Sequence, residues 1–310
     1  SGRLFKAGVL VKSGDALERM AKIDTVVIDK TGTLTEGRPR LVEPEALPEG
    51  VLELAARLAR TSRHPLSRAI ADAAGMGPAA KGVSETPGGG LECVEEGRRL
   101  RFGSARWLGI EAVSDPHSEA WLIVDDGEPV RFRFQDRLRS DAREAIDGLR
   151  QRGCRIELLS GDRTGPVGLI AAELGIEDWI AELKPQQKIA RIEALRAGGR
   201  CVLMIGDGIN DAPALAAADA SVSLAAAAEI SQAAADFVLR GNKLAGCLVA
   251  LDISRAARRR VLENFALAAG YNMIAVPLAV IGLVTPLIAA IAMSASSILV
   301  TLNALRLARR

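Results

Sequence analysis

Three acidic side chains each follow a short apolar run in this 310-residue sequence. Asp29 ends the β-branched run Thr25–Ile28, and Asp162 and Asp207 follow two later runs. Apolar runs of this kind are typical of parallel strands buried on both faces. Because open α/β sheets place reactive groups at the carboxyl ends of such strands, we expect the three carboxylates to meet at one edge of a sheet.

Asp29 opens the segment Asp29–Thr35, which reads DKTGTLT. A carboxylate can attack the terminal phosphoryl group of ATP when Mg²⁺ screens the repulsion between the two anions. Mg²⁺ prefers oxygen donors in octahedral geometry. The carboxylates of Asp29 and Asp207 and the backbone carbonyl of Thr31 are therefore the predicted magnesium ligands.

Further residues could assist such a transfer. Lys184, in the run Lys184–Lys188, is predicted to neutralise the transferring phosphoryl group. Ser160 and Asn210, beside the second and third acidic residues, can donate hydrogen bonds to its oxygens.

The elements that must position these residues alternate between strand and helix. Two strands besides Thr25–Ile28 are predicted, at Arg155–Leu159 and Cys201–Ile205. Helical periodicity is found in four segments, namely Asp15–Ala21, Ala142–Arg150, Val167–Leu174 and Ile189–Arg196. This alternation predicts an α/β domain with a parallel sheet.

Residues 38–131 have a different character. Helical periodicity at Val51–Arg60 and Leu66–Ala74 is followed by short strand-like pieces at Leu100–Phe102 and Trp121–Val124. The pattern predicts an inserted α+β domain with its own core.

Two long uncharged runs lie near the end of the sequence. Phe265–Val284 and Leu287–Leu305 are separated by Thr285 and Pro286, and arginines flank both outer ends. Runs of this length predict a transmembrane hairpin with both ends on the cytoplasmic side. The alternative is a buried hairpin in a soluble core, which the lack of a polar face disfavours.

The composition excludes some partners. Lys and Arg number 40 and Asp and Glu 38, so the net charge of +2 does not call for a nucleic acid. The four cysteines are far apart and favour neither a zinc site nor disulfides. Residues 1–11 lack the pattern of a signal peptide, and we expect the chain to be part of a longer protein.

Taken together, Asp29–Thr35, Ser160–Asp162 and Gly206–Pro213 resemble the motifs of P-type ATPases in the haloacid dehalogenase superfamily. The resemblance covers essentially the whole chain. It implies a Rossmannoid phosphorylation domain with an inserted nucleotide-binding domain. It also implies that Asp29 becomes an aspartyl phosphate, with Mg²⁺ on Asp207 and support from Asp211.

The residue two positions after Asp29 separates a pump from a phosphatase. Phosphatases of this superfamily usually place a second Asp there, which hydrolyses the acyl phosphate. Here it is Thr31, which cannot act as a general base near neutral pH. We therefore expect the phosphoenzyme to persist long enough to drive a conformational step.

Other motifs resemble the nucleotide site of the heavy-metal subgroup. By this resemblance His64, in Ser62–Leu66, contacts the adenine side of ATP, and Gly88 and Gly90 let the backbone approach the nucleotide. Taken alone, a His before Pro is more often a helix cap, and a glycine-rich turn is often only a turn. Arg63 stands where the subgroup commonly has Glu.

Tyr271 and Asn272 in the first apolar run, with Met293 and Ser297 in the second, resemble the copper(I) pattern of that subgroup. A thioether suits a soft cation such as copper(I), and polar groups inside a bilayer tend to be functional. The alternative is that the methionine packs against lipid and the serines bond to their own helix.

The expected divisions are 1–36 and 133–242 for the phosphorylation domain, 37–132 for the inserted domain and 243–310 for the stalk and two membrane helices. The leading hypothesis is that the protein exports copper(I) at the expense of ATP, lies in the inner membrane and has its catalytic domains in the cytoplasm. This chain would be the C-terminal half, requiring the upstream half to transport. The alternatives are a soluble phosphatase of the same superfamily and a non-transporting nucleotide-binding fragment.

Overall fold

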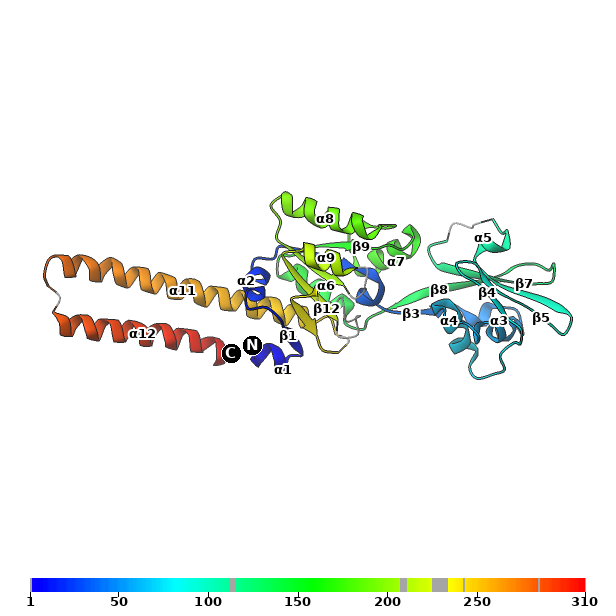
Figure 1. Cartoon of the computed structure of the whole chain (residues 1–310), viewed down its shortest axis with the longest axis horizontal. Helices are drawn as coiled ribbons and strands as arrows, with labels where there is room; N and C mark the ends of the chain where they lie inside the picture. The colour runs from blue at the N-terminus through cyan, green and yellow to red at the C-terminus, as the bar shows by residue number, and fades with distance from the viewer. Residues whose placement is uncertain are drawn as a thin grey trace.

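Figure 1 presents the computed structural model, which describes residues 2–111, 115–206, 211–224, 234–241, 243–283 and 285–309. The molecule is elongated, with a central α/β domain. A second β-sheet domain lies at one end, and a pair of long helices extends from the other. Both predicted domains and the predicted helical pair are therefore present.

The central sheet has seven strands, and all but one neighbouring pair are parallel. The antiparallel pair is formed by the edge strand β1 with β13. The spatial order is β1 (Val9–Val11), β13 (Phe237–Leu239), β12 (Ala220–Leu224), β11 (Val202–Gly206), β2 (Thr25–Asp29), β9 (Arg155–Leu159) and β10 (Asp178–Ile180). The three predicted strands are thus confirmed as the adjacent strands β11, β2 and β9.

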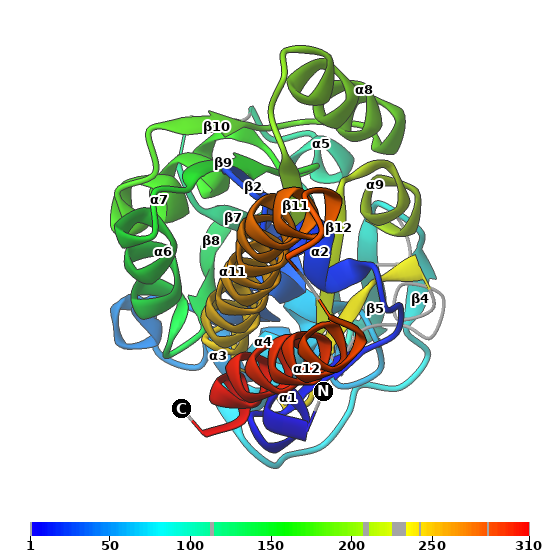
Figure 2. The same ribbon diagram turned by 90° about the vertical axis from the view of Figure 1, so that its left-hand side faces the viewer.

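Helices cover both faces of this sheet, as Figure 2 shows. Along β2, Val26 and Ile28 join one hydrophobic core while Val27 joins the other, because successive side chains of a strand point to opposite faces. The first face carries α2 (Ala16–Met20), α6 (Ala142–Gln151), α7 (Thr164–Leu174) and the start of α11, and the second carries α8 (Pro185–Ala197) and α9 (Ala212–Ala217). The short helix α1 (Gly2–Lys6) precedes β1.

The inserted domain is built on a six-stranded antiparallel sheet. Its order is β3 (Thr35–Leu41), β8 (Val130–Leu138), β7 (Ser118–Val124), β6 (Arg98–Gly103), β5 (Gly90–Glu95) and β4 (Ser84–Thr86). Helices α3 (Val51–Ala59) and α4 (Pro65–Ala74) pack on one face, and α5 (Ala105–Leu108) packs on the other. Strands β3 and β8 connect this sheet to the central domain (Figure 1).

The long pair consists of α11 (Gly246–Val280) and α12 (Pro286–Arg309). Within α11, Cys247, Ala250 and Leu251 are buried in the central core, whereas Val261, Leu262 and most of the apolar residues beyond them are exposed. Among the described residues, α11 alone is long and apolar enough to cross a membrane. The described apolar part of α12, Leu287–Asn303, is shorter. Of the two predicted membrane spans, the described residues therefore contain one of full length.

Candidate active site

The strand ends meet as the sequence predicts. Asp29, the last residue of β2, lies opposite Leu159 of β9, so Ser160 follows at the same edge. On its other side β2 pairs with β11 up to Ile205, directly before Gly206. Asp29 and Ser160 are buried there, with 5% and 1% of their surfaces exposed. Asp207 and Asn210 lie outside the described residues.

The lysine in contact with Asp29 is Lys188, not Lys184. The ammonium nitrogen of Lys188 lies 2.5 Å from Asp29 Oδ1 and 2.8 Å from Asp211 Oδ1. Lys184 precedes α8 and is exposed, and its backbone N–H donates to the side chain of Gln187. The prediction for Lys184 is therefore wrong in position: α8 begins after Lys184, and its first turn carries the next lysine into the site.

Lys188 remains charged in this buried position. Burial alone would lower the pKa of its ammonium group, but Asp29 and Asp211 outweigh that effect, so the pKa is raised. A fixed positive charge beside a candidate nucleophile attracts an anionic substrate and stabilises negative charge that develops there. Gly206 makes room for this arrangement, because a Cβ there would lie 3.1 Å from Cβ of Asp211.

The loop after Asp29, residues Lys30–Leu34, is held by a side chain that the sequence analysis did not identify. Arg139, directly after β8, donates hydrogen bonds to the carbonyl oxygens of Gly32 and Thr33. Gly32 has a φ of 72°, which favours glycine. Arg139 therefore ties the loop to the strand that returns from the inserted domain.

A second network joins the same loop to the inserted domain. Lys30 is 2% exposed and pairs with Asp136 of β8 and, at 2.7 Å, with Asp162. The hydroxyl of Thr31 also donates to Asp162, at 2.9 Å. Asp162, the acidic residue after β9, thus faces Thr31 and Lys30.

The Lys30–Asp162 pair should make stability depend on acid pH. Burial alone would raise the pKa of the Asp162 carboxyl, but the hydrogen bond and charge of Lys30, with the bond from Thr31, lower it below the ordinary 3.8. The stabilisation is complete above the ordinary carboxyl pKa and is lost as the pH falls through the lowered value. We expect Asp162→Asn to lower Tm at neutral pH and to flatten the loss of Tm toward acid pH. An unchanged acid slope, matching that of the exposed-site control Asp72→Asn, would contradict this.

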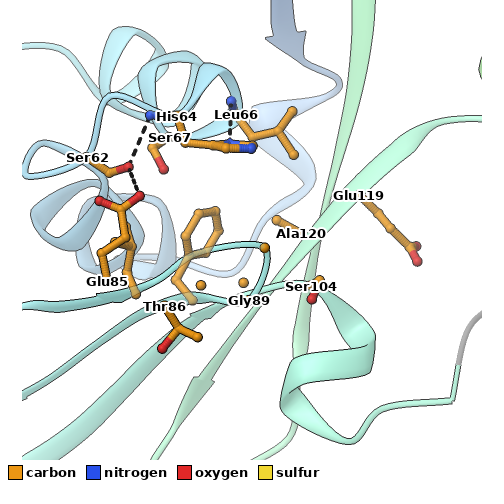
Figure 3. Close-up of a pocket in the computed structure, with 15 residues that line it drawn as sticks. Ser62, His64, Leu66, Ser67, Glu85, Thr86, Gly89, Ser104, Glu119 and Ala120 are labelled. Carbon is orange, nitrogen blue, oxygen red and sulfur yellow. Dashed lines mark hydrogen bonds between the residues drawn. The ribbon is translucent and has the colours of Figure 1, made fainter. Parts of the chain in front are cut away.

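The residues predicted to meet the nucleotide line one pocket of about 150 Å³ in the inserted domain. His64 caps α4 by accepting a hydrogen bond at Nδ1 from the Leu66 N–H. Its backbone N–H donates to Ser62 Oγ, and that hydroxyl donates to Glu85 (Figure 3). Because Nδ1 accepts this bond, a neutral His64 carries its proton on Nε2. The residue is a helix cap and a pocket residue at once.

Gly88 and Gly90 also line the pocket, but the structure gives each a local reason to be glycine. Gly88 has a φ of 71°. At Gly90 an added Cβ would lie 2.4 Å from the Phe102 carbonyl oxygen and 2.6 Å from Gly103 Cα. Close approach of β5 and β6 therefore requires glycine at position 90 even without a ligand.

We expect Gly90→Ala to destabilise the inserted domain by about 1–3 kcal/mol through this overlap. Chemical denaturation followed by tryptophan fluorescence would measure the change, since Trp107 and Trp121 lie in that domain. Gly14→Ala is the control, because a Cβ there meets no atom within 4 Å. Equal stability of both variants would contradict the packing argument.

The candidate transported-metal residues lie on the two long helices, Tyr271 and Asn272 on α11 and Met293 and Ser297 on α12. Tyr271 is half-buried, whereas Asn272, Met293 and Ser297 are exposed. Ser294 bonds back to the Ala290 carbonyl of its own helix, as the alternative reading predicts for these serines.

The fold and the site place the chain in a known class. A model of the haloacid dehalogenase-like hydrolase family matches residues 23–219, which is more than half of the chain. The match spans the candidate nucleophile, Lys188 and the inserted domain. The chain therefore belongs to the haloacid dehalogenase-like hydrolases.

Individual relatives narrow the family assignment further. "Nitrogen fixation protein FixI" of Rhizobium meliloti (strain 1021) is 47% identical over 311 residues, covering 100% of this chain and 41% of that protein. "Probable copper-transporting ATPase SynA" of Synechococcus elongatus is 40% identical, covering 99% of this chain and 42% of that protein. The crystal structure of a zinc-transporting PIB-type ATPase in the E2.Pi state superposes with a TM-score of 0.86 at 30% identity, covering 99% of this chain and 53% of that one.

The resemblance of the motifs to those of the P-type ATPases is thereby confirmed. Within the haloacid dehalogenase-like family, the chain belongs to the P-type ATPases. The chain spans about two fifths of the length of the curated relatives it matches.

Proposed function

We propose that this chain is the catalytic part, with its adjoining membrane helices, of an ATP-driven heavy-metal pump, and that Asp29 accepts the phosphoryl group. The observation that carries the proposal is the buried Asp29 carboxylate at the end of β2, in contact with Lys188. The boundaries near residues 36, 132 and 242 belong to the same proposal.

In the proposed step, a carboxylate oxygen of Asp29 attacks the γ-phosphorus of ATP. A new P–O bond forms as the bond to the β-phosphate oxygen breaks, and ADP leaves with that electron pair. Lys188 would face the growing charge on the phosphoryl oxygens, and Ser160, buried at the same edge of the sheet, would donate a hydrogen bond to them. Asp211 keeps Lys188 in position.

Magnesium fits the donors at this strand end. The Asp29 carboxylate and the Thr31 carbonyl are hard oxygen ligands on one short loop, and Asp207 follows the adjacent strand. When bound, Mg²⁺ would offset the negative charge shared by the phosphates and the nucleophile.

The acyl phosphate should be long-lived because the position two residues after Asp29 carries no general base. Thr31 has a hydroxyl in place of a carboxylate. The carboxylate that contacts Thr31, that of Asp162, is engaged by Lys30 as well, and its lowered pKa makes it a weak base. Slow hydrolysis allows the phosphoenzyme to drive a change of conformation, which a phosphatase does not need.

ATP would bind with its base in the pocket beside His64, where Nε2–H is available as a donor. Gly88 and Ser104 line the same pocket. Strands β3 and β8, which tie the inserted domain to the β2 loop, would then let closure of that domain deliver the γ-phosphate to Asp29.

The transported ion is proposed to be copper(I) or a related soft cation, held in part by Tyr271, Asn272, Met293 and Ser297. A thioether suits copper(I) better than zinc. One relative is named for copper and the superposed structure for zinc. The exposed faces of α11 and α12 would then meet the upstream part of the pump inside the inner membrane, with the catalytic domains in the cytoplasm.

Acid-quenched labelling with γ-labelled ATP tests the proposal. We expect label that is stable in acid and released by hydroxylamine, and no label in Asp29→Asn. Little stable label would favour a soluble phosphatase, and nucleotide binding without label would favour a non-transporting binding fragment.

A further inference from the structure

A pocket lined by arginines lies where α11 leaves the central domain. Its lining residues are Arg3, Asp252, Arg255, Ala256, Arg259, Arg260 and Arg306, and its volume is about 300 Å³. They come from three segments far apart in sequence, namely α1, α11 and the end of α12. Figure 1 shows these segments side by side near the two chain ends.

Positive charge dominates this pocket. Its one acidic lining residue, Asp252, already accepts hydrogen bonds from Nη2 and Nε of Arg152, at 2.6 and 2.7 Å. Arg260 pairs with Glu263 at 2.5 Å, which offsets one further charge. Arg259 has no partner among the residues described. Guanidinium groups match phosphate oxygens in geometry and charge, so the pocket is suited to a phosphate-bearing ligand.

A polar link between the two long helices builds the pocket. Asn303 of α12 is buried and donates to Glu263 and to Asn264 of α11, at 3.2 and 2.9 Å. This link sets the register of the helices and holds Arg306 near Arg260. Arg255 is fixed by bonds to the backbone carbonyls of Arg152 and Ile23.

The surroundings indicate a lipid. Immediately after Arg260, α11 exposes Val261, Leu262 and Phe265, and these begin the long apolar part of the helix. A phosphate held by the arginines would therefore have acyl chains that continue along an apolar surface. A soluble phosphate has no acyl chains, so the apolar surface would add nothing to its binding free energy. Anionic lipids are also concentrated at the cytoplasmic side of membranes, where arginines of this kind are attracted.

We propose that this pocket binds the headgroup of an anionic phospholipid and so fixes α11 and α12 at the cytoplasmic boundary. The inference rests on the membrane placement in the proposed function. It does not require phosphoryl transfer, which takes place at the opposite end of the central domain.

Native mass spectrometry of the full chain in mild detergent, titrated with phosphatidylglycerol or phosphatidylcholine, tests the proposal. We expect tighter binding of phosphatidylglycerol. In Arg259→Gln/Arg306→Gln its affinity should fall roughly thirty-fold, since each basic residue near a membrane surface contributes about a five-fold factor. The control Lys81→Gln/Arg200→Gln removes the same charge at two exposed sites and should bind as wild type does.

Equal binding of both lipids, or wild-type affinity in the arginine variant, would overturn the lipid site. Competition by glycerol phosphate as strong as by the lipid would assign the pocket to a soluble anion and overturn it too. Hydroxylamine-labile label measured on the same variants keeps this outcome separate from the catalytic proposal. Failure of the chain to insert into vesicles of either lipid would overturn both the lipid site and the membrane placement. The proposal that Asp29 is phosphorylated would still be tested separately by the labelling.

Discussion

Replacing Lys188 with Gln should reduce the rate of phosphoenzyme formation by about 10²–10³-fold, the typical loss when one group that stabilises transition-state charge is removed. The ammonium group of Lys188 contacts Asp29. Without it, the phosphoryl oxygens lose their nearest fixed charge, and Asp29 and Asp211 are left facing each other. Rapid-quench labelling with γ-labelled ATP at saturating nucleotide would measure the rate.

Lys184→Gln is the matched control, because it removes the same charge four residues away on an exposed side chain. Its rate should stay within about two-fold of wild type, in line with the small effects of exposed substitutions. Nucleotide binding to the inserted domain, measured on both variants, shows whether that domain remains folded. A large loss in Lys184→Gln with little in Lys188→Gln would contradict the assignment.

Thr31→Asp should shorten the life of the phosphoenzyme by about 10²-fold or more, because it places a general base two residues after Asp29. The residue is exposed on the loop beside the nucleophile, so the substitution does not disturb the core. Decay of the label after a chase with unlabelled ATP and a chelator would measure the lifetime.

Thr31→Asn provides the control, since it has nearly the shape of the aspartate without its basicity. Both variants lose the Thr31 hydroxyl that donates to Asp162, so they differ from each other only by the charged, basic carboxylate of the aspartate. Equal decay of Thr31→Asp and Thr31→Asn would show that the base is not what limits hydrolysis here.

The sequence was enough to predict the elements that carry the site. The run Thr25–Ile28 is apolar on both faces, and β2 is indeed buried between two cores. Strand Arg155–Leu159 was predicted with the bounds that β9 has. Local patterns suffice for such elements because burial on both faces leaves few alternatives.

Lys188 rather than Lys184 contacts Asp29 because α8 begins directly after Lys184. Lys188, Ile192 and Leu195 are buried together, and their spacing of four and three residues marks the inward face of the helix. Lys184 precedes the helix and shares no such face. Helical periodicity could therefore have identified the correct residue.

Other contacts at the site could not be predicted from any local sequence pattern. Arg139 reaches the loop at Gly32 and Thr33 from more than a hundred residues away, as does Asp136 when it pairs with Lys30. Such pairings follow from the way β3 and β8 leave and re-enter the central domain. Spacing along the chain does not encode that geometry, so the network that ties the loop to the inserted domain emerged only from the fold.

The decisive experiment identifies the amino acid that carries the phosphoryl group. Borohydride reduction of the acid-quenched phosphoenzyme converts an aspartyl phosphate to homoserine, and mass spectrometry of the peptides then locates it. We expect homoserine at position 29 in the wild-type chain and none after Asp29→Asn. Phosphate found on a serine, threonine or histidine, or homoserine at another aspartate, would contradict it.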